Sequence, residues 1–254
     1  MVATRQGHSE VDECLLDRVA QVVRRCKFVV ALTGAGISAE SGIPTFRNSS
    51  GLRQNDAEWQ QFASTEAFNA NPKKVLDWYA QKRKELRHVE PTPGHLALAG
   101  FENKVLEFFL VTQNIDGLHQ RAGSTSVVEL NGNIWFDRCV GCNYRQRTEN
   151  IELVQNHCPM CGNWLRPAVV WLGEALPAKA FSTALEAAGN CELLITIGTS
   201  ATVQPAASLV FEAKSSGAII IEINPDQTEA SSITDIRLAG RAEEILPELV
   251  RRAN

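Results

Sequence analysis

Five short apolar runs constrain the fold of this 254-residue chain more than any other feature of its sequence. They are rich in β-branched residues, as strands buried on both faces of a sheet are expected to be, and they cover residues 28–32, 108–112, 126–130, 193–197 and 219–223. Segments with apolar residues at helical spacing lie between them, at residues 11–25, 72–86, 177–188 and 206–215. This alternation predicts an α/β fold with a doubly wound, parallel, Rossmann-like sheet.

The residues that follow the five runs are expected to share one crevice. In an open parallel sheet, ligands bind beyond the carboxyl ends of the strands. A polar residue or a glycine comes just after each run, and these five positions are Gly34, Gln113, Asn131, Gly198 and Asn224. The sequence therefore predicts a single ligand-binding crevice at this edge of the sheet.

A glycine-containing stretch, GAGISAESGIPTFR at residues 34–47, follows the first run. Glycines after a buried strand allow a sharp turn and bring backbone N–H groups close to an anion, so we expect Gly34 and Gly36 to present free amides to a phosphate. A tight turn without a ligand also fits these two glycines, because the third glycine of the usual dinucleotide fingerprint is missing. Arg47, on the same loop, would offer a diphosphate a cationic partner.

Four cysteines form two pairs of metal-ligand spacing. Cys139 and Cys142 make one CxxC motif, Cys158 and Cys161 make the other, and fifteen residues separate the pairs. Four thiolates in this pattern predict one tetrahedral Zn²⁺, which has no open position for water and is therefore structural. The other three cysteines, Cys14, Cys26 and Cys191, lack ligand spacing and are expected to be ordinary buried residues.

Composition narrows the choice of partners and of location. The net charge is −4 and the Lys and Arg residues are scattered, so nucleic acid is not expected as a partner. No apolar run reaches the roughly 20 residues of a membrane span. The first residues are polar and contain Glu10, Asp12 and Glu13, which argues against a targeting leader and favours the cytoplasm.

We expect a monomer with two parts, a Rossmann-like domain (1–134 and 167–254, with a helical and cofactor-loop part at about 38–105) and a zinc module (135–166).

Three motifs together resemble those of the sirtuins, which are NAD-dependent protein lysine deacylases. The first is the stretch at residues 34–47. The second is Thr-Gln-Asn-Ile-Asp at 112–116, with Leu-His at 118–119 and Ala-Gly at 122–123. The third is Gly-Thr-Ser at 198–200, followed by Val203 and by Pro-Ala-Ala at 205–207. The resemblance extends from about residue 14 to about residue 250, includes the four cysteines, and is greatest for the class III, desuccinylase-like members.

This resemblance implies a set of NAD-binding residues. Those expected at the diphosphate and the nicotinamide ribose are Gly34, Ala35, Gly36, Ser38, Glu40, Phe46 and Arg47. Those expected around the nicotinamide pocket are Gln113, Asn114, Ile115 and Asp116, of which Gln113, Asn114 and Asp116 would also serve catalysis. Those expected on the adenosine side are Gly198, Thr199, Ser200, Asn224 and Ala242. His119 is expected to be a hydrogen-bonded packing residue.

The resemblance also implies a binding site for an acyl-lysine peptide. The segment RPAVVWLGE at residues 166–174 is similar to the family's strand that pairs with the substrate backbone, with Leu172 where most members have Phe. The expected substrate contacts here are Val170, Leu172, Gly173, Glu174 and Val203. Backbone pairing reads little sequence, so we expect a loose peptide preference.

The acyl group itself is expected to contact a class III pocket. A small residue, Ala63, would widen this pocket, and Tyr79 would bind the carboxylate of a dicarboxylic acyl group such as succinyl. Lys82 stands where that class has Arg, and Arg83 follows it, so either cation could complete the site. A solvated basic helix face explains Lys82 and Arg83 equally well.

The main departure from the family is Asn131, in Glu-Leu-Asn-Gly-Asn at residues 129–133, where the family has a proton-accepting His. A neutral imidazole can take a proton near pH 7, but an amide oxygen has negligible basicity there. Loss of a general base typically costs about 10² to 10⁴ in rate, so turnover should be strongly impaired while NAD and acyl-lysine still bind. Asn131 is either a deliberate substitution that traps a complex, which we favour, or a natural variant.

The expected activity is therefore NAD-dependent protein lysine deacylation, which yields nicotinamide, O-acyl-ADP-ribose and free lysine. An NAD glycohydrolase or ADP-ribosyltransferase is the first alternative, because it needs release of nicotinamide but not the later attack of a ribose hydroxyl. A noncatalytic protein that binds NAD or acyl-lysine is the second.

Overall fold

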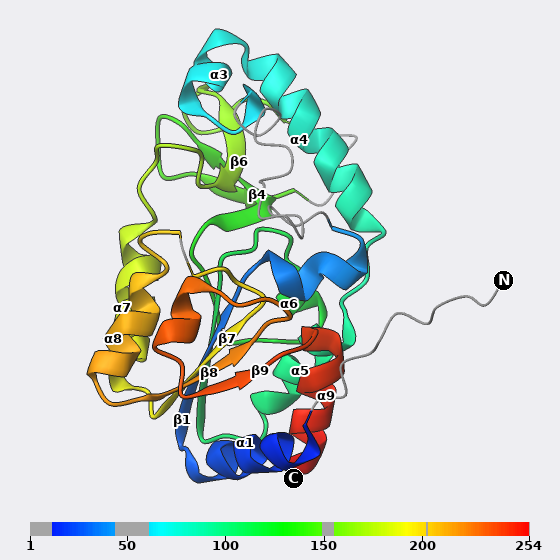
Figure 1. Ribbon diagram of the computed structural model, residues 1–254. Coiled ribbons are helices and arrows are strands. Elements are labelled where there is room, and N and C mark those ends of the chain that lie inside the picture. Colours follow the sequence, from blue (N-terminus) through cyan, green and yellow to red (C-terminus); the bar gives the residue numbers. More distant parts are fainter. Residues whose placement is uncertain (1–11, 44–60, 149–154, 202, 254) are drawn as a thin grey trace, which may run out of the picture.

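The computed structural model of this protein describes residues 12–43, 61–148, 155–201 and 203–253 (Figure 1). Two residues of the expected NAD site, Phe46 and Arg47, lie outside these ranges. None of the helices within the described ranges combines the length and the apolar composition that crossing a membrane requires.

The larger sheet has six parallel strands, which confirms the predicted fold class. The strands across the sheet are, in order, β3 (Val127–Glu129), β2 (Glu107–Thr112), β1 (Phe28–Thr33), β7 (Leu193–Ile197), β8 (Ile219–Ile223) and β9 (Ile236–Leu238). Five of them coincide with the predicted runs. The sixth, β9, was not predicted, and it is a three-residue strand at the edge of the sheet.

Helices cover both faces of this sheet, because the side chains of each strand alternate between the faces. On β1, Val29 and Ala31 pack into one core with α1 (Glu13–Arg25), α5 (Pro93–Phe101) and α9 (Ala242–Arg252). Val30 and Leu32 pack into a second core with α7 (Ala178–Asn190) and α8 (Ser208–Ser215). Figure 1 shows α7 and α8 together on one side of the sheet and α5 and α9 on the other. The predicted helices at α1, α7 and α8 are present, as is the one at residues 72–86, which is α4 (Pro72–Arg87), and α5 and α9 were not predicted.

A smaller part of the molecule contains a three-stranded antiparallel sheet in the order β5-β4-β6. The strands are β4 (Gly132–Cys139), β5 (Arg145–Arg147) and β6 (Leu165–Val169), and the helices beside them are α3 (Thr65–Ala70) and α4 (Pro72–Arg87). An aromatic core that includes Phe68, Tyr79 and Trp171 joins these elements. The predicted module boundaries, 135 and 166, fall inside β4 and β6.

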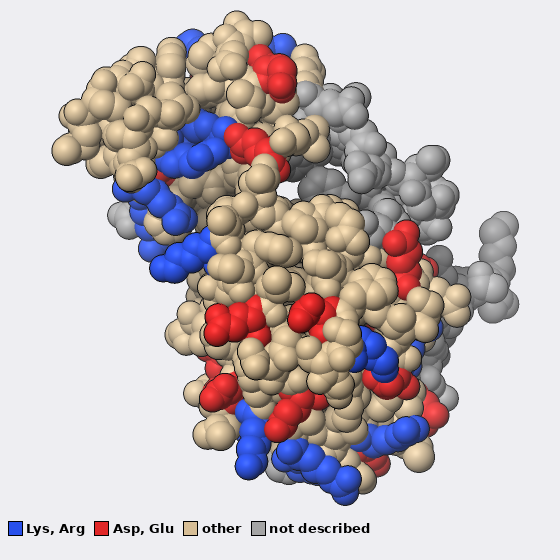
Figure 2. Space-filling model, turned by 90° about the vertical axis from the view of Figure 1, so that its left-hand side faces the viewer, with Lys and Arg blue, Asp and Glu red and all other residues tan. Residues whose placement is uncertain are grey.

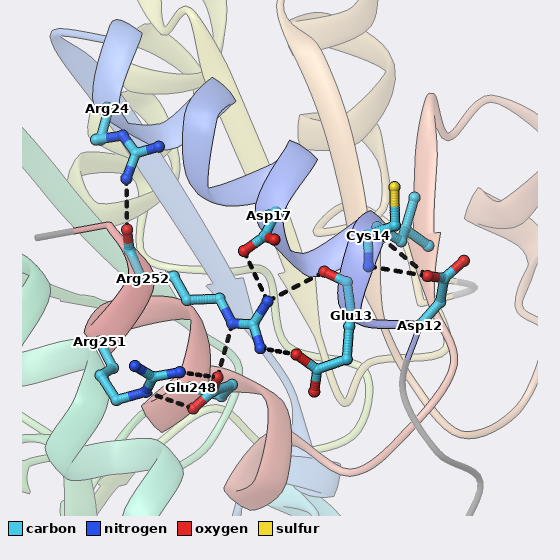
Figure 3. Close-up of polar contacts among 9 residues, drawn as sticks. Asp12, Glu13, Cys14, Asp17, Arg24, Glu248, Arg251 and Arg252 are labelled. Carbon is cyan, nitrogen blue, oxygen red and sulfur yellow. Dashed lines mark hydrogen bonds and ion pairs between the residues drawn. The ribbon is translucent and has the colours of Figure 1, made fainter.

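The first and last described helices are tied together at their ends (Figure 3). The guanidinium of Arg252 pairs with Glu13 and Asp17 of α1 and with Glu248 of α9. Arg24 donates in return to the backbone oxygen of Arg252 at 2.5 Å. Three shorter elements complete the described fold: η1 (Ala35–Ser41), α6 (Leu118–Arg121) and η2 (Glu229–Ser232).

Candidate functional site

The glycine loop after β1 packs directly against the loop after β7. The Gly34 N–H donates to Ile197 O at 3.0 Å, and the Gly36 N–H donates to Gly198 O at 2.8 Å. A Cβ atom at Gly36 would lie 2.6 Å from the Cα of Gly198, so no larger residue fits there. The expectation that Gly34 and Gly36 present free amides is therefore wrong, because both amides bond within the fold and the glycines serve the close approach of two loops. The N–H of Ala35, at the start of η1, has no acceptor among the described residues.

A buried polar cluster links this loop to the loop after β2. Ser38 donates to the carboxylate of Asp116 at 2.8 Å. The side-chain amide of Asn114 donates to Gly34 O at 3.0 Å and to Ser38 Oγ at 3.2 Å. Burial raises the pKa of Asp116, while hydrogen bonds from Leu118 N–H and Ser38 act in the opposite direction. The structure thus brings together three of the predicted NAD residues, Ser38, Asn114 and Asp116, and orients each by hydrogen bonds.

Two buried histidines lie beside this cluster. His119 makes a 2.9 Å hydrogen bond with Thr33 Oγ1, and its ring centroid lies 4.7 Å from that of His95. Burial lowers the pKa of His95 to about 4, and it also holds the pKa of His119 well below its usual value, with the neighbouring His95 as a second cause. Both rings are therefore neutral near pH 7.

His95 was not singled out from the sequence. It closes a capping box at the start of α5, in which Thr92 N–H donates to His95 Nδ1 at 3.1 Å. Because Nδ1 accepts this bond, the ring proton of neutral His95 is on Nε2, which lies 3.4 Å from Ser38 Oγ. A Thr followed three residues later by a side chain that can bond back to it was the available signal.

Asn131 lies between the NAD side and the substrate side of the predicted crevice. Its side-chain amide donates to Gln113 O at 2.7 Å, and its backbone oxygen accepts from Val170 N–H at 2.9 Å. Gln113 in turn donates to Thr199 Oγ1 at 2.9 Å. The half-buried Asn131 is therefore held against the loop after β2 and the segment after β6 at the same time.

Two of the predicted adenosine-side residues, Thr199 and Asn224, meet at the strand ends. The Asn224 side chain donates to Thr199 O at 3.1 Å and accepts from Asp226 N–H at 3.1 Å. Ala242 lies at the first position of α9, directly after Arg241, whose guanidinium pairs with Glu40 of η1 at 2.9 Å. This ion pair places the start of α9, and with it Ala242, next to Glu40, which is 202 positions away in the sequence.

The segment expected to bind the peptide is braced from both sides. Leu172 N–H donates to Ala63 O at 2.9 Å, which joins this segment to the start of α3. The carboxylate of Glu174 accepts two bonds from Arg166, at 2.6 and 2.8 Å, and one from Trp171 N–H at 2.9 Å. Leu172 itself is 49% exposed, as is Val203. The segment is thus rigidly attached while these apolar side chains remain open to a ligand.

The structure corrects the prediction for Arg83. This side chain is only 2% exposed, and its Nη2 lies 2.7 Å from Asp137 Oδ1. Its Nε donates to Ile134 O at 2.7 Å. Arg83 therefore stabilises the contact of α4 with β4, and it is neither a ligand for an acyl carboxylate nor part of a solvated face.

Tyr79 and Lys82 have different surroundings. Tyr79 is fully buried, and its hydroxyl oxygen accepts from Trp171 Nε1 at 2.9 Å. Burial raises the pKa of Tyr79, so the phenol is protonated and its O–H can act as a donor. Lys82 Nζ lies 3.3 Å from Glu85 Oε2 and 5.5 Å from the centroid of the Trp78 ring.

The four predicted zinc ligands converge on one point. The sulfur atoms of Cys139, Cys142, Cys158 and Cys161 all lie within 4.8 Å of one another. Three of the separations are 3.4 to 3.6 Å. Zinc–sulfur bonds of about 2.3 Å in a tetrahedron place the sulfurs about 3.8 Å apart, so the cluster fits one Zn²⁺. With four sulfur ligands the ion is structural, and it ties β4 to the turn before β6.

Comparison with known proteins agrees with this geometry. The family model described as "Sir2 family" matches residues 34–205. The NAD-dependent protein deacylase of Aquifex aeolicus is 48% identical over 216 residues, which are 84% of this chain and 90% of that protein. The deacylase of the same description from Pyrococcus furiosus is 41% identical over 244 residues, 93% of this chain and 97% of that protein.

Solved structures show the same relationship. The structure of a Sir2 homologue in complex with NAD has a TM-score of 0.84 and 40% identity, and it covers 98% of this chain and 96% of its own. A mutant Sir2 homologue in complex with ADP ribose has a TM-score of 0.86 and 43% identity, covering 95% and 96%. The chain therefore belongs to the Sir2 family, and its cofactors are NAD and one structural zinc ion.

Proposed function

We propose that this chain is an NAD-dependent protein lysine deacylase in a form that binds its substrates but turns over slowly. The reaction would transfer the acyl group of a modified lysine to the ADP-ribose part of NAD, with release of nicotinamide. Its relatives are named NAD-dependent protein deacylases. A Sir2 protein bound to a myristoylated histone peptide has a TM-score of 0.75 and 32% identity, covering 95% of this chain and 97% of its own. These likenesses support an acyl-lysine substrate.

The observation that carries the slow turnover is the position of Asn131. Its amide donates to Gln113 O, so it lies beside the predicted nicotinamide pocket, where a general base would be needed. An amide cannot take a proton from a ribose hydroxyl near pH 7. We infer a loss of about 10² to 10⁴ in rate relative to a chain with His at this position.

No neighbouring group among the described residues is well placed to replace that base. His95 Nδ1 accepts from Thr92, and its Nε2 faces Ser38. His119 is 1% exposed and bonded to Thr33. Asp116 accepts from Ser38 and from Leu118 N–H. Each of these groups serves to hold the loops of the predicted NAD site in place.

We further propose a preference for dicarboxylic acyl groups such as succinyl. Ala63 is small, and the Tyr79 O–H has a donor proton left after its oxygen accepts from Trp171. Tyr79 is fully buried, so this role requires that the acyl group reach it by displacing the side chains packed around it. With Arg83 assigned to the ion pair with Asp137, Lys82 is the remaining candidate for the acyl carboxylate. Lys offers a point charge in place of the bidentate fork of Arg, so the preference should be weaker than an Arg would give.

The test is Asn131→His, assayed with NAD and with acetyl-, succinyl- and glutaryl-lysine peptides. We expect O-acyl-ADP-ribose to form at least about a hundredfold faster in the variant. The variant would be matched with Asn156→His, which places the same residue in the zinc-binding part of the chain. Absence of any deacylation by Asn131→His would contradict the proposal. Equal rates on acetyl- and succinyl-lysine, or no effect of Tyr79→Phe on their ratio, would contradict the acyl preference.

An NAD glycohydrolase or ADP-ribosyltransferase is the second candidate. The cluster of Ser38, Asn114 and Asp116 supports release of nicotinamide, and Asn131 would hinder only the later step. Mass spectrometry of the products separates the possibilities. Free ADP-ribose would indicate hydrolysis, modified protein would indicate transfer, and binding without release of nicotinamide would indicate a noncatalytic binder.

A further inference from the structure

Three arginines are aligned across the small sheet. Arg138 on β4 lies opposite Arg145 on β5 and opposite Arg166 on β6. Residues directly opposite one another in antiparallel strands share a face of the sheet, with Cβ atoms about 5 Å apart. Arg145, Arg138 and Arg166 therefore form a row of guanidinium groups across one face, which we name the arginine row.

Only one end of the arginine row is neutralised by a close ion pair among the described residues. Arg166 is buried, makes two hydrogen bonds to Glu174, and has its guanidinium 3.3 Å from the centre of the Trp171 ring. Arg138 also forms an ion pair with the Glu174 carboxylate, at a longer distance of 3.3 Å, and its side chain is 48% exposed. Like charges directly opposite one another destabilise a sheet. The row therefore has a net positive charge that a further anion would stabilise.

Arg145 is exposed, and its side chain packs on an aromatic ring. Its guanidinium lies 4.3 Å from the centroid of the Phe136 ring, an arrangement that fixes the planar group without neutralising it. Its charge also acts on Glu129, at the end of β3, whose pKa is raised mainly by burial and is lowered in part by Arg145. Glu129 is already engaged, because its Oε1 accepts from Gln120 and Asn133.

The arginine row runs beside the segment that is expected to bind the peptide. One end of the row, Arg166, belongs to the segment at residues 166–174, stacks on Trp171 and pairs with Glu174, and the row extends from there across β4 to Arg145 on β5. Figure 2 shows Lys and Arg side chains gathered on the smaller, upper lobe where it meets the larger one. This local charge contrasts with the net charge of −4 of the whole chain. A peptide paired with residues 170–174 would lie next to the chain segment that begins at Arg166, at one end of the row.

We propose that Arg138 and Arg145 bind acidic side chains of the protein segment that carries the acyl-lysine, so that this chain prefers acyl-lysines flanked by Asp or Glu. The inference rests on the proposed function and deepens it. Backbone pairing alone predicts a loose peptide preference, and the arginine row adds a charge preference to it. A guanidinium accepts a carboxylate in a planar, two-pronged contact, which suits this role better than an ammonium group does.

The experiment measures peptide binding to the chain as it stands, with Asn131, by fluorescence anisotropy. Two succinyl-lysine peptides differ only in having Glu or Gln on either side of the modified lysine. We expect the Glu peptide to bind about fivefold more tightly at low salt, with a smaller ratio at high salt. Arg138→Gln with Arg145→Gln should bring the ratio close to one. Arg145→Gln alone should reduce it partly, which provides a second variant if the double variant does not fold.

The matched control is Arg18→Gln with Arg25→Gln, which removes the same charge from exposed positions on α1 and should leave the ratio unchanged. Equal affinities of the two peptides for the unaltered chain, or a ratio that survives the double substitution on the arginine row, would overturn the proposal. Failure of the Glu peptide to bind would do so as well. Arginine-dependent binding of a single-stranded oligonucleotide that exceeds binding of the Glu peptide would also overturn it.

Unacylated versions of both peptides separate this inference from the proposed function. If the Glu peptide binds equally well with and without its acyl group, the charge preference holds and the deacylase assignment is contradicted. If binding requires the acyl group but ignores the flanking charge, the deacylase assignment holds and the arginine row has no role in substrate choice.

Discussion

Arg83 and Asp137 join α4 to β4 through an ion pair that is almost fully removed from water. The Nη2–Oδ1 distance is 2.7 Å, and the two side chains are 2% and 4% exposed. Both groups are further satisfied, since Arg83 donates to Ile134 O and Asp137 accepts from Thr148. An ion pair with this degree of burial is costly to break from one side, because the remaining charge has neither water nor an opposite charge beside it.

We therefore expect Asp137→Asn to lower the free energy of unfolding by about 3 to 5 kcal/mol, measured by urea denaturation. The control is Asp77→Asn, which removes the partner of Lys73 in an exposed pair on the same helix and should cost less than about 1 kcal/mol. A similar decrease in the free energy of unfolding in both variants would show that the buried pair stabilises the fold no more than the exposed pair does.

Removal of zinc should affect the small sheet more than the large one. The four cysteine sulfurs join β4 to the turn before β6, so a chelator or Cys142→Ser should unfold or loosen this part. We expect one zinc per chain by elemental analysis and a loss of amide protection in β4 to β6 by hydrogen exchange. Of the three cysteines expected to be buried, only Cys191 is; Cys26 is partly buried and Cys14 is exposed, so that part of the prediction is wrong for Cys14. Cys14→Ser, outside the cluster, should retain the metal. Retention of a full zinc equivalent by Cys142→Ser would contradict the assignment of this ligand.

The sequence predicted the strands of the large sheet well, because a strand buried on both faces must be apolar throughout its length. The edge strand β9 lacks this signature, since it has three residues with Arg237 in the middle. Positions such as Gln113 and Asn224 could be placed at the crevice from their location after a strand. The hydrogen bond from Gln113 to Thr199 could not be predicted in this way, because it depends on how two loops meet.

Arg83 illustrates a different limit. It belongs to a run of positive charges, which favours a solvated helix face. Val75, Tyr79 and Arg83 follow one another at intervals of four residues, which places Arg83 on the buried face of α4 and was a signal in the other direction. Its partner, Asp137, is 54 positions away on another element, so the sequence alone gave no means of recognising the pair. The amides of Gly34 and Gly36 were misjudged for the same reason, since their acceptors lie on the loop after β7.

The ion pairs of Arg252 should contribute to the stability of α1 and α9. Its guanidinium binds Glu13, Asp17 and Glu248, and its side chain is only 11% exposed (Figure 3). We expect Arg252→Gln to lower Tm by about 3 °C and to increase hydrogen exchange at the C-terminal end of α9. Arg251→Gln, which loses a contact to Glu248 alone, should change Tm less. A larger fall in Tm for Arg251→Gln than for Arg252→Gln would contradict a stabilising role of the Arg252 ion pairs.

Stability should fall as the pH decreases from about 6.5 to about 4, and His95 should be one cause. The pKa of His95 is lowered to about 4 in the folded chain by burial, whereas an imidazole in the unfolded chain titrates near 6.5. Between these values the unfolded state binds a proton that the folded state does not, so acidification favours unfolding. The effect is on the order of 3 kcal/mol when the pH has fallen below 4. His119, whose pKa burial also lowers well below its usual value, should act in the same direction.

The measurement is urea denaturation between pH 4 and pH 7 for the unaltered chain and for His95→Gln. The Gln side-chain oxygen can still accept from Thr92 N–H, so the variant should fold and its stability should depend less steeply on pH. His88→Gln, at an exposed histidine, should keep the original slope. Parallel pH profiles for the unaltered chain and His95→Gln would mean that His95 does not carry the effect. A slope that remains in His95→Gln but disappears in His119→Gln would assign it to the ring bonded to Thr33.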